Sequence, residues 1–165
     1  MRESQAADPS AGEARTVGVE PPRQPEILEL MRQGDEFTLA LYPPESCHLL
    51  GVEELEAPGV TVFVARGEAG VALGMAALVD RGDASAELKR MFVPEAARGR
   101  GIAGLILAEV ELFASTHAIE LIQLETGPLQ LAAIALYERG GYLPIPNFGK
   151  YIGDPNSVCF EKRIG

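Results

Sequence analysis

The most informative stretch of the sequence is VPEAARGRGIAG, residues 93–104. A strand-like apolar segment ends at Pro94, a glycine-rich loop follows, and an apolar helical pattern begins at Gly101. The first amides of a helix have no partner within the helix and lie at the positive end of its dipole, so this arrangement suits a phosphate or pyrophosphate. Residues 89–100 hold four cations and one carboxylate, a local charge of +3. The loop alone is equally compatible with the plain start of a helix.

Strands and helices alternate around this loop. A helix that Pro25 opens and Gly34 ends follows the first strand, because proline is tolerated at the first helical position and glycine favours helix ends. The pattern indicates a mixed α/β (α+β) fold in a single domain, residues 15–165, after a flexible tail at residues 1–14. We expect strands at 15–20, 60–65, 70–79, 86–93, 119–125, 142–145 and 158–162, and later helices at 101–117 and 129–139.

Composition and charge exclude several classes of protein. The 165 residues carry 14 Lys and Arg against 24 Asp and Glu, a net charge of −10, which argues against nucleic-acid and anionic-membrane partners. No apolar run is long enough to span a membrane, and the amino terminus lacks a signal-peptide pattern, so we expect a cytoplasmic protein. Cys47 and Cys159 have no metal-ligand spacing, and we expect two free buried thiols and no metal.

A dinucleotide-binding enzyme is a minor alternative. GRGIAG at residues 99–104 matches the G-x-G-x-x-G fingerprint, and Glu125 ends the next strand about 20 residues later, as that fingerprint requires. However, five residues separate the preceding strand from Gly99, and the antiparallel strands before the loop leave no room for two mononucleotide-binding halves.

Three motifs in order give a more specific interpretation. RGRGIA at 98–103 lies between a strand and a helix, ELKRMFV at 87–93 forms the preceding strand, and LYERGGY at 136–142 covers a late helix and the strand after it. With these motifs the chain resembles the GNAT family of N-acetyltransferases over at least residues 60–163. The resemblance implies a mixed, mostly antiparallel sheet with helices on both faces.

The resemblance also implies an activity and a cosubstrate. Members of the family transfer the acetyl group of acetyl-CoA directly to a primary amine, so we expect an acyltransferase acting on a small-molecule or peptide amine. A CoA-binding or sensory module without catalysis is the second interpretation, and a monomer and a homodimer are both compatible with the family. The residues implied to bind the cofactor are Met91, Phe92 and Val93, Arg98, Gly99, Arg100, Gly101, Ile102 and Ala103, and Gln130, where many members have Asn.

Two residues are candidates for the chemistry. The family resemblance places Tyr137 near the cofactor sulfur as the proton donor, and it places Glu87 as the base that deprotonates the amine. A packed core tyrosine and a strand carboxylate paired with neighbouring cations are the structural alternatives. Tyr42, Glu45 and Tyr151 are candidates for the acceptor site, with ordinary packing as their alternative.

Overall fold

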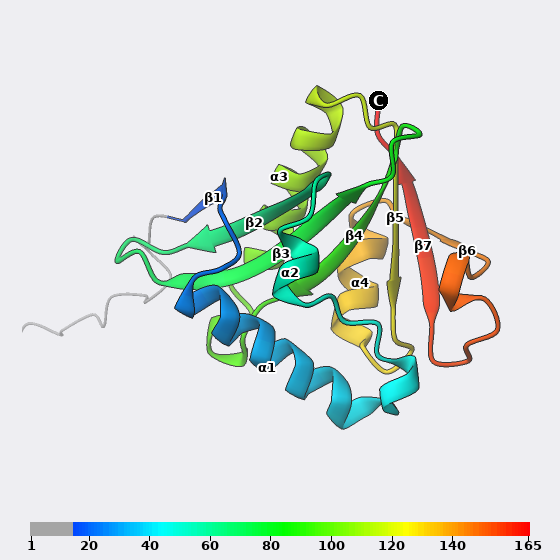
Figure 1. Cartoon of the computed structure of the whole chain (residues 1–165), viewed down its shortest axis with the longest axis horizontal. Coiled ribbons are helices and arrows are strands. Elements are labelled where there is room, and N and C mark those ends of the chain that lie inside the picture. Colours follow the sequence, from blue (N-terminus) through cyan, green and yellow to red (C-terminus); the bar gives the residue numbers. More distant parts are fainter. Residues whose placement is uncertain (1–14) are drawn as a thin grey trace, which may run out of the picture.

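A computed structural model describes residues 15–165 (Figure 1), and the flexible tail predicted at residues 1–14 lies outside this part of the chain. Seven strands form one sheet in the order β1-β2-β3-β4-β5-β7-β6, and every neighbouring pair is antiparallel except the parallel pair β4–β5. The predicted mixed, mostly antiparallel fold is therefore confirmed. The strands are β1 Thr16–Val19, β2 Val60–Arg66, β3 Ala72–Asp80, β4 Ser85–Phe92, β5 Leu121–Thr126, β6 Leu143–Ile145 and β7 Val158–Arg163.

Helices cover both faces of the sheet, as Figure 1 shows. On one face α1 and α2 pack over buried side chains that include Val62 and Val64, and on the other α3 and α4 pack over Phe63 and Ala65. This alternation along β2 follows from the two-residue period of a strand, which sends successive side chains to opposite faces. The helices are α1 Pro25–Leu41, α2 Val52–Leu55, α3 Ile102–Thr116 and α4 Leu131–Arg139, with 3-10 turns at Pro44–Ser46, Glu95–Ala97 and Gly149–Tyr151.

Helix α1 is longer than the sequence predicted. The prediction that Gly34 ends this helix is wrong: Gly34 is buried within α1 and packs against the ring of Phe92, which lies 3.4 Å from the position of a Cβ atom. The helix ends after Leu41, because Tyr42 precedes Pro43 and has an extended backbone, as residues before proline prefer.

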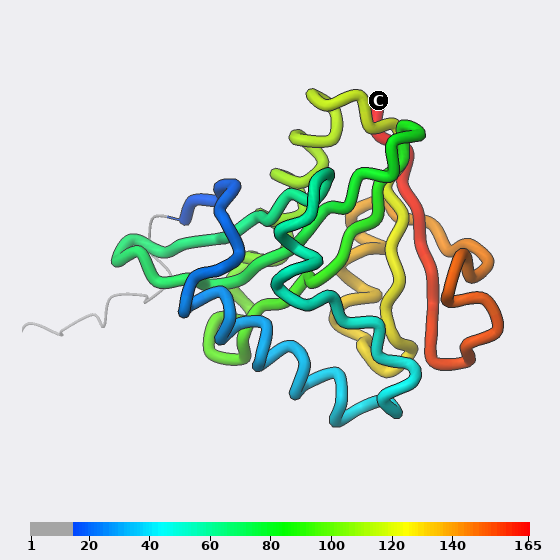
Figure 2. Tube along the Cα trace, viewed as in Figure 1, coloured from blue at the N-terminus to red at the C-terminus, as the bar shows by residue number. Residues whose placement is uncertain are grey.

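Helix α1 runs toward the carboxyl end of β5, and the segment after it begins beside that end (Figure 2). There the Tyr42 hydroxyl accepts a hydrogen bond from the Leu129 amide (2.9 Å), and the Ser46 hydroxyl donates one to the Asp154 carboxylate (3.2 Å). Residues distant in sequence are thus brought together at one end of the sheet.

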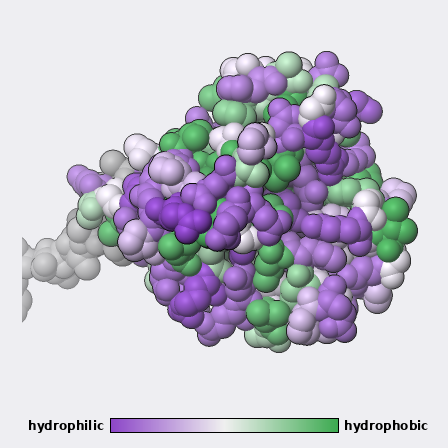
Figure 3. Space-filling view, in the orientation of Figure 1, coloured by the Kyte–Doolittle hydropathy of each residue, from purple (hydrophilic) through white to green (hydrophobic). Residues whose placement is uncertain are grey.

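The molecular face in Figure 3 is largely hydrophilic, with small hydrophobic patches separated by polar side chains. Within residues 15–165, no helix has the length and apolar character needed to cross a membrane. Both cysteines are free thiols, with Cys159 buried and Cys47 half-buried.

Gly127, in the loop after β5, permits the close approach of Tyr42. A Cβ atom at this position would lie 1.9 Å from the Tyr42 hydroxyl oxygen, so the ring would have to move. We expect Gly127→Ala to lower the free energy of unfolding by about 1–3 kcal/mol, the usual cost of overpacking, in chemical denaturation. Gly104→Ala is the control, because a Cβ there meets no atom within 4 Å. Equal stability of the two variants would contradict this role of Gly127.

Candidate functional site

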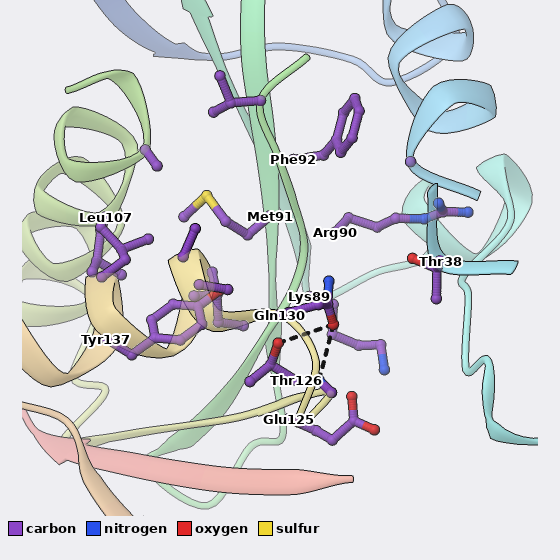
Figure 4. A pocket seen from close by; sticks show the side chains of 18 of the residues that line it. Thr38, Lys89, Arg90, Met91, Phe92, Leu107, Glu125, Thr126, Gln130 and Tyr137 are labelled. Carbon is purple, nitrogen blue, oxygen red and sulfur yellow. Dashed lines mark hydrogen bonds between the residues drawn. The ribbon is translucent and has the colours of Figure 1, made fainter. Parts of the chain in front are cut away.

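A cavity of about 960 Å³ opens where β4 and β5 separate. The two strands pair in parallel from Ser85 and Leu121 as far as Leu88 and Leu124, and beyond that point β4 bends away. The cavity is lined by the end of β4, the loop before α3, the first turns of α3, the end of β5 and one side of α4, and α1 and the segment after it close the remaining side (Figure 4).

A bulge in β4 produces the separation. Ala77 pairs with Lys89 and Met75 with Phe92, so both Arg90 and Met91 lie opposite Ala76. Arg90 has a φ of +57°, a left-handed conformation that is unfavourable for a residue with a side chain.

The side chain of Arg90 holds the bulge in place. Its guanidinium is 6% exposed, donates two hydrogen bonds to the Leu50 carbonyl (2.9 Å from Nε and 2.5 Å from Nη2), and forms an ion pair with Asp35 of α1. Because these partners come from α1 and the segment after it, the opening of the sheet is tied to both.

The loop before α3 presents backbone amides to the cavity. Gly99 and Gly101 have φ values of +77° and +76°, and Cβ atoms on them would meet nothing within 4 Å. Within residues 15–165, the amides of Gly99, Gly101, Ile102, Ala103 and Gly104 donate to no protein acceptor. Such amides at a helix start form a cradle for an anion.

Arg98 is occupied by contacts within the chain. Its Nε donates to the Val93 carbonyl (3.0 Å), and its guanidinium lies 5.0 Å from the centre of the Phe37 ring. The side chain thus fastens the loop to the end of β4 and to α1. Arg100 lies in the same loop, and its carbonyl accepts a hydrogen bond from Arg15.

The free edge of β4 offers a second kind of binding surface. Met91, Phe92 and Val93 line the cavity beyond the last β4–β5 pair, so the backbone edge that faces β5 pairs with no strand there. An extended ligand can pair with such an edge as an added strand.

Helix α4 contributes Tyr137 and Gln130. Tyr137 is 5% exposed and lines the cavity, and its hydroxyl has no hydrogen-bond partner in residues 15–165. Burial, assisted by the negative charge of Glu125, raises the pKa of this phenol, so it stays protonated. The side-chain oxygen of Gln130, Oε1, accepts hydrogen bonds from the Thr126 hydroxyl (3.1 Å) and the Gly127 amide (2.9 Å). These bonds fix the start of α4.

Glu87 lies in a polar cluster beside the cavity and is not among its lining residues. Its Oε2 accepts from the Tyr151 hydroxyl (2.6 Å) and from Lys89 Nζ (3.4 Å), and its Oε1 lies 3.5 Å from the Arg81 guanidinium. Glu87 therefore contacts two residues that do line the cavity, Tyr151 and Lys89.

Glu125 is the carboxylate that lines the cavity at the end of β5 (Figure 4). Burial raises the pKa of this carboxyl, although the Ser157 hydroxyl, which donates to Oε2 at 2.6 Å, and the charge of Lys89 partly oppose the shift. Within residues 15–165 Glu125 forms no ion pair. The sequence suggested Glu125 only for a dinucleotide site, because where the pairing of β4 and β5 ends is visible only in the structure.

The three residues predicted for an acceptor site have different surroundings. Tyr42 and Tyr151 are buried and line the cavity, whereas Glu45 is exposed and lies outside its lining. Sequence reasoning also passed over Lys89 and His48, which line the same end of the cavity.

Comparisons with known proteins agree with this geometry. The chain matches the acetyltransferase (GNAT) family over residues 26–142. It is 36% identical over 150 residues to the IAA acetyltransferase of Azospirillum brasilense, covering 90% of this chain and 97% of that protein. An acetyltransferase of the GNAT family from Staphylococcus aureus Mu50 shares the fold with a TM-score of 0.73 at 19% identity, covering 92% of this chain and 100% of that one. PaiA N-acetyltransferase from Thermoplasma acidophilum, solved in complex with coenzyme A, has a TM-score of 0.71 at 16% identity, covering 90% and 99% of the two chains.

Proposed function

Because the chain belongs to the acetyltransferase (GNAT) family and is an acetyl-CoA-dependent acyltransferase, we propose that it transfers the acetyl group directly to a primary amine in the cavity between β4 and β5. The family resemblance read from the sequence is confirmed. The observation that carries the proposal is the joining, in one cavity, of an anion cradle, a free strand edge, a buried phenol and a half-buried carboxylate. We take residues 15–165 as the one catalytic domain.

The cavity residues fit acetyl-CoA. The open space in front of Gly99 and Gly101 lets a pyrophosphate approach the unpaired amides up to Gly104, and no side chain blocks it. The backbone edge of Met91–Val93 would pair with the extended pantetheine arm. When bound, acetyl-CoA supplies an acetyl group activated as a thioester.

Glu125 and Tyr137 would move the protons of the reaction. An amine arrives as an ammonium ion, which cannot attack a carbonyl, and the Glu125 carboxylate accepts its proton directly or through one water. The neutral nitrogen then forms the new C–N bond as the C–S bond breaks, and the Tyr137 hydroxyl protonates the departing sulfur. The nitrogen loses a second proton as the amide forms, and this proton returns through water to Tyr137. The first proton leaves the site from Glu125, so each turnover releases one proton.

The anion cradle can be tested by thermal unfolding. We expect acetyl-CoA to raise the Tm of the wild type, because a ligand selective for the native state stabilises it. Gly101→Asp should abolish this shift by placing a carboxylate in the cradle. Gly70→Asp is the matched control: Gly70 has a φ of +78° with open space around it, and it lies in the β2–β3 turn outside the cavity. An equal shift in both variants would remove the cradle from the cofactor site.

The role of Tyr137 can be tested with Tyr137→Phe, which keeps the packed ring and removes only the hydroxyl. We expect kcat to fall about 10-fold or more with little change in KM for acetyl-CoA, since general-acid help is gained mainly in the transition state. Steady-state release of free thiol measures both constants. A variant with full kcat would exclude the hydroxyl from the mechanism.

The two candidate bases can be compared directly. We expect Glu125→Gln to lower kcat/KM for the amine about 100-fold, with the largest loss at pH values above the pKa of Glu125 and below that of the amine, where the base is ionised and the amine is still protonated. Glu87→Gln should have the smaller effect, because Glu87 lies outside the cavity lining. The wild-type rate should fall as the pH drops through the raised pKa of Glu125, which protonates the base. A larger loss in Glu87→Gln than in Glu125→Gln would assign the base to Glu87 instead.

A further inference from the structure

Lys89 and Glu125 are the first residues of β4 and β5 beyond their last pair, Leu88 and Leu124. Leu88 and Leu124 point into the core beneath α3 and α4, so Lys89 and Glu125 are directed to the opposite face, the side of α1. Both line the cavity, and Figure 4 shows them at one end of it, apart from Tyr137. The opening of the sheet therefore places one cation and one anion side by side at the end of the cavity that Tyr42, His48 and Tyr151 also line, which we call the acceptor half.

The positive charge at Lys89 is incompletely neutralised. The Lys89 side chain is 10% exposed, and its ammonium donates to the Tyr151 hydroxyl (2.6 Å) and lies 3.4 Å from Glu87 Oε2. The same Glu87 carboxylate also pairs with the Arg81 guanidinium at 3.5 Å. Because one carboxylate serves two cations, this cluster carries a surplus of one positive charge beside the cavity. Burial lowers the pKa of Lys89, as expected of a cation whose compensation is partial.

The negative charge at Glu125 is compensated even less. Its hydrogen-bond partner is the neutral Ser157 hydroxyl, and within residues 15–165 Lys89 and Glu125 form no ion pair with each other. Lys89 and Glu125 thus face one cavity with opposite charges and do not pair with each other. Leaving largely buried charges without full partners is unfavourable, and a ligand between them could pair with both.

A third polar group stands at the same end. The Nε2 atom of His48 is buried and has no hydrogen-bond partner within residues 15–165, although Asp154 Oδ2 lies 3.7 Å away. The imidazole ring packs edge-on against Tyr151, with ring centres 5.0 Å apart, and His48 lines the cavity. The acceptor half thus holds spare hydrogen-bonding capacity besides its two charges.

We propose that the amine acceptor is a small zwitterion of the α-amino-acid type, bound with its ammonium group against Glu125 and its carboxylate against Lys89. One molecule then forms ion pairs with both side chains. The nitrogen of the acceptor lies against Glu125, the carboxylate that accepts its proton. Lys89 selects the acceptor and takes no part in the acetyl transfer itself. This inference rests on the proposed acetyl transfer to an amine, and it names the class of that amine.

Matched sets of three amines test the inference. Each set contains a free L-amino acid, its amide and its decarboxylated amine, for alanine, methionine and phenylalanine, and thiol release from acetyl-CoA gives kcat/KM for each compound. We expect at least one amino acid to exceed both of its partners by about 10-fold or more, the value of one charge-assisted contact.

Variants of Lys89 assign this preference to its side chain. Lys89→Met should raise KM for the preferred amino acid about 10-fold and bring the ratio of amino acid to amide close to 1, while Lys89→Arg, which keeps the charge, should retain part of the preference. Lys150→Met is the matched control, because Lys150 is exposed and lies outside the cavity lining, and loss of its charge, which lowers the pKa of Lys89, favours the protonated Lys89 on which the preference depends. Thermal unfolding of each variant checks that it folds.

The outcomes distinguish failure of the amino-acid acceptor from failure of the acetyl transfer itself. Turnover of amides and decarboxylated amines at rates equal to or above those of the amino acids would overturn the zwitterion and leave acetyl transfer in place. A preference for amino acids that survives in Lys89→Met would also overturn the assignment. A wild type that binds acetyl-CoA and acetylates no amine of any set would overturn the proposed transfer, and the zwitterion with it.

Discussion

The early end of pairing between β4 and β5 is the constraint from which the site follows. A parallel pair that continued past Leu88 and Leu124 would fill the sheet, leaving no free strand edge and no cavity. The bulge at Arg90 and Met91 prevents this by turning the end of β4 away. The strain of the left-handed Arg90 is offset by its bonds to Leu50 and Asp35, so contacts with α1 and the segment after it keep the sheet open.

The two halves of the cavity differ in the kind of group that they offer to a ligand. In the cofactor half the binding groups are backbone amides and a strand edge, whose positions depend on secondary structure and on glycines that leave space in front of them. In the proposed acceptor half they are half-buried charged side chains, Lys89 and Glu125, whose pKa values respond to burial and to their neighbours. This division suits an enzyme that holds one common cosubstrate by its general shape and selects its acceptor by charge.

Contacts distant in sequence assemble the acceptor half. Tyr42, directly after α1, fits against Gly127 so closely that a side chain there would displace the Tyr42 ring. Tyr151, in the loop before β7, joins Glu87 to Lys89 through its hydroxyl. The α1 segment and the late loop therefore form walls of the same site, although more than one hundred residues separate them.

The sequence by itself determined the mixed fold, the glycine loop before α3 and the late helix that carries Tyr137, because these rest on local signals: period, helix-start amides and short motifs. It did not reveal that α1 continues through Gly34, where the tertiary contact with Phe92 overrides the tendency of glycine to end a helix. Nor did it identify Glu125 as a candidate base beside Glu87, since both are carboxylates within strands and no local pattern shows which one faces a cavity. Only the tertiary structure decided which of them lines the cavity, because that depends on where two strands stop pairing and on which cations the folded sheet brings to each carboxylate.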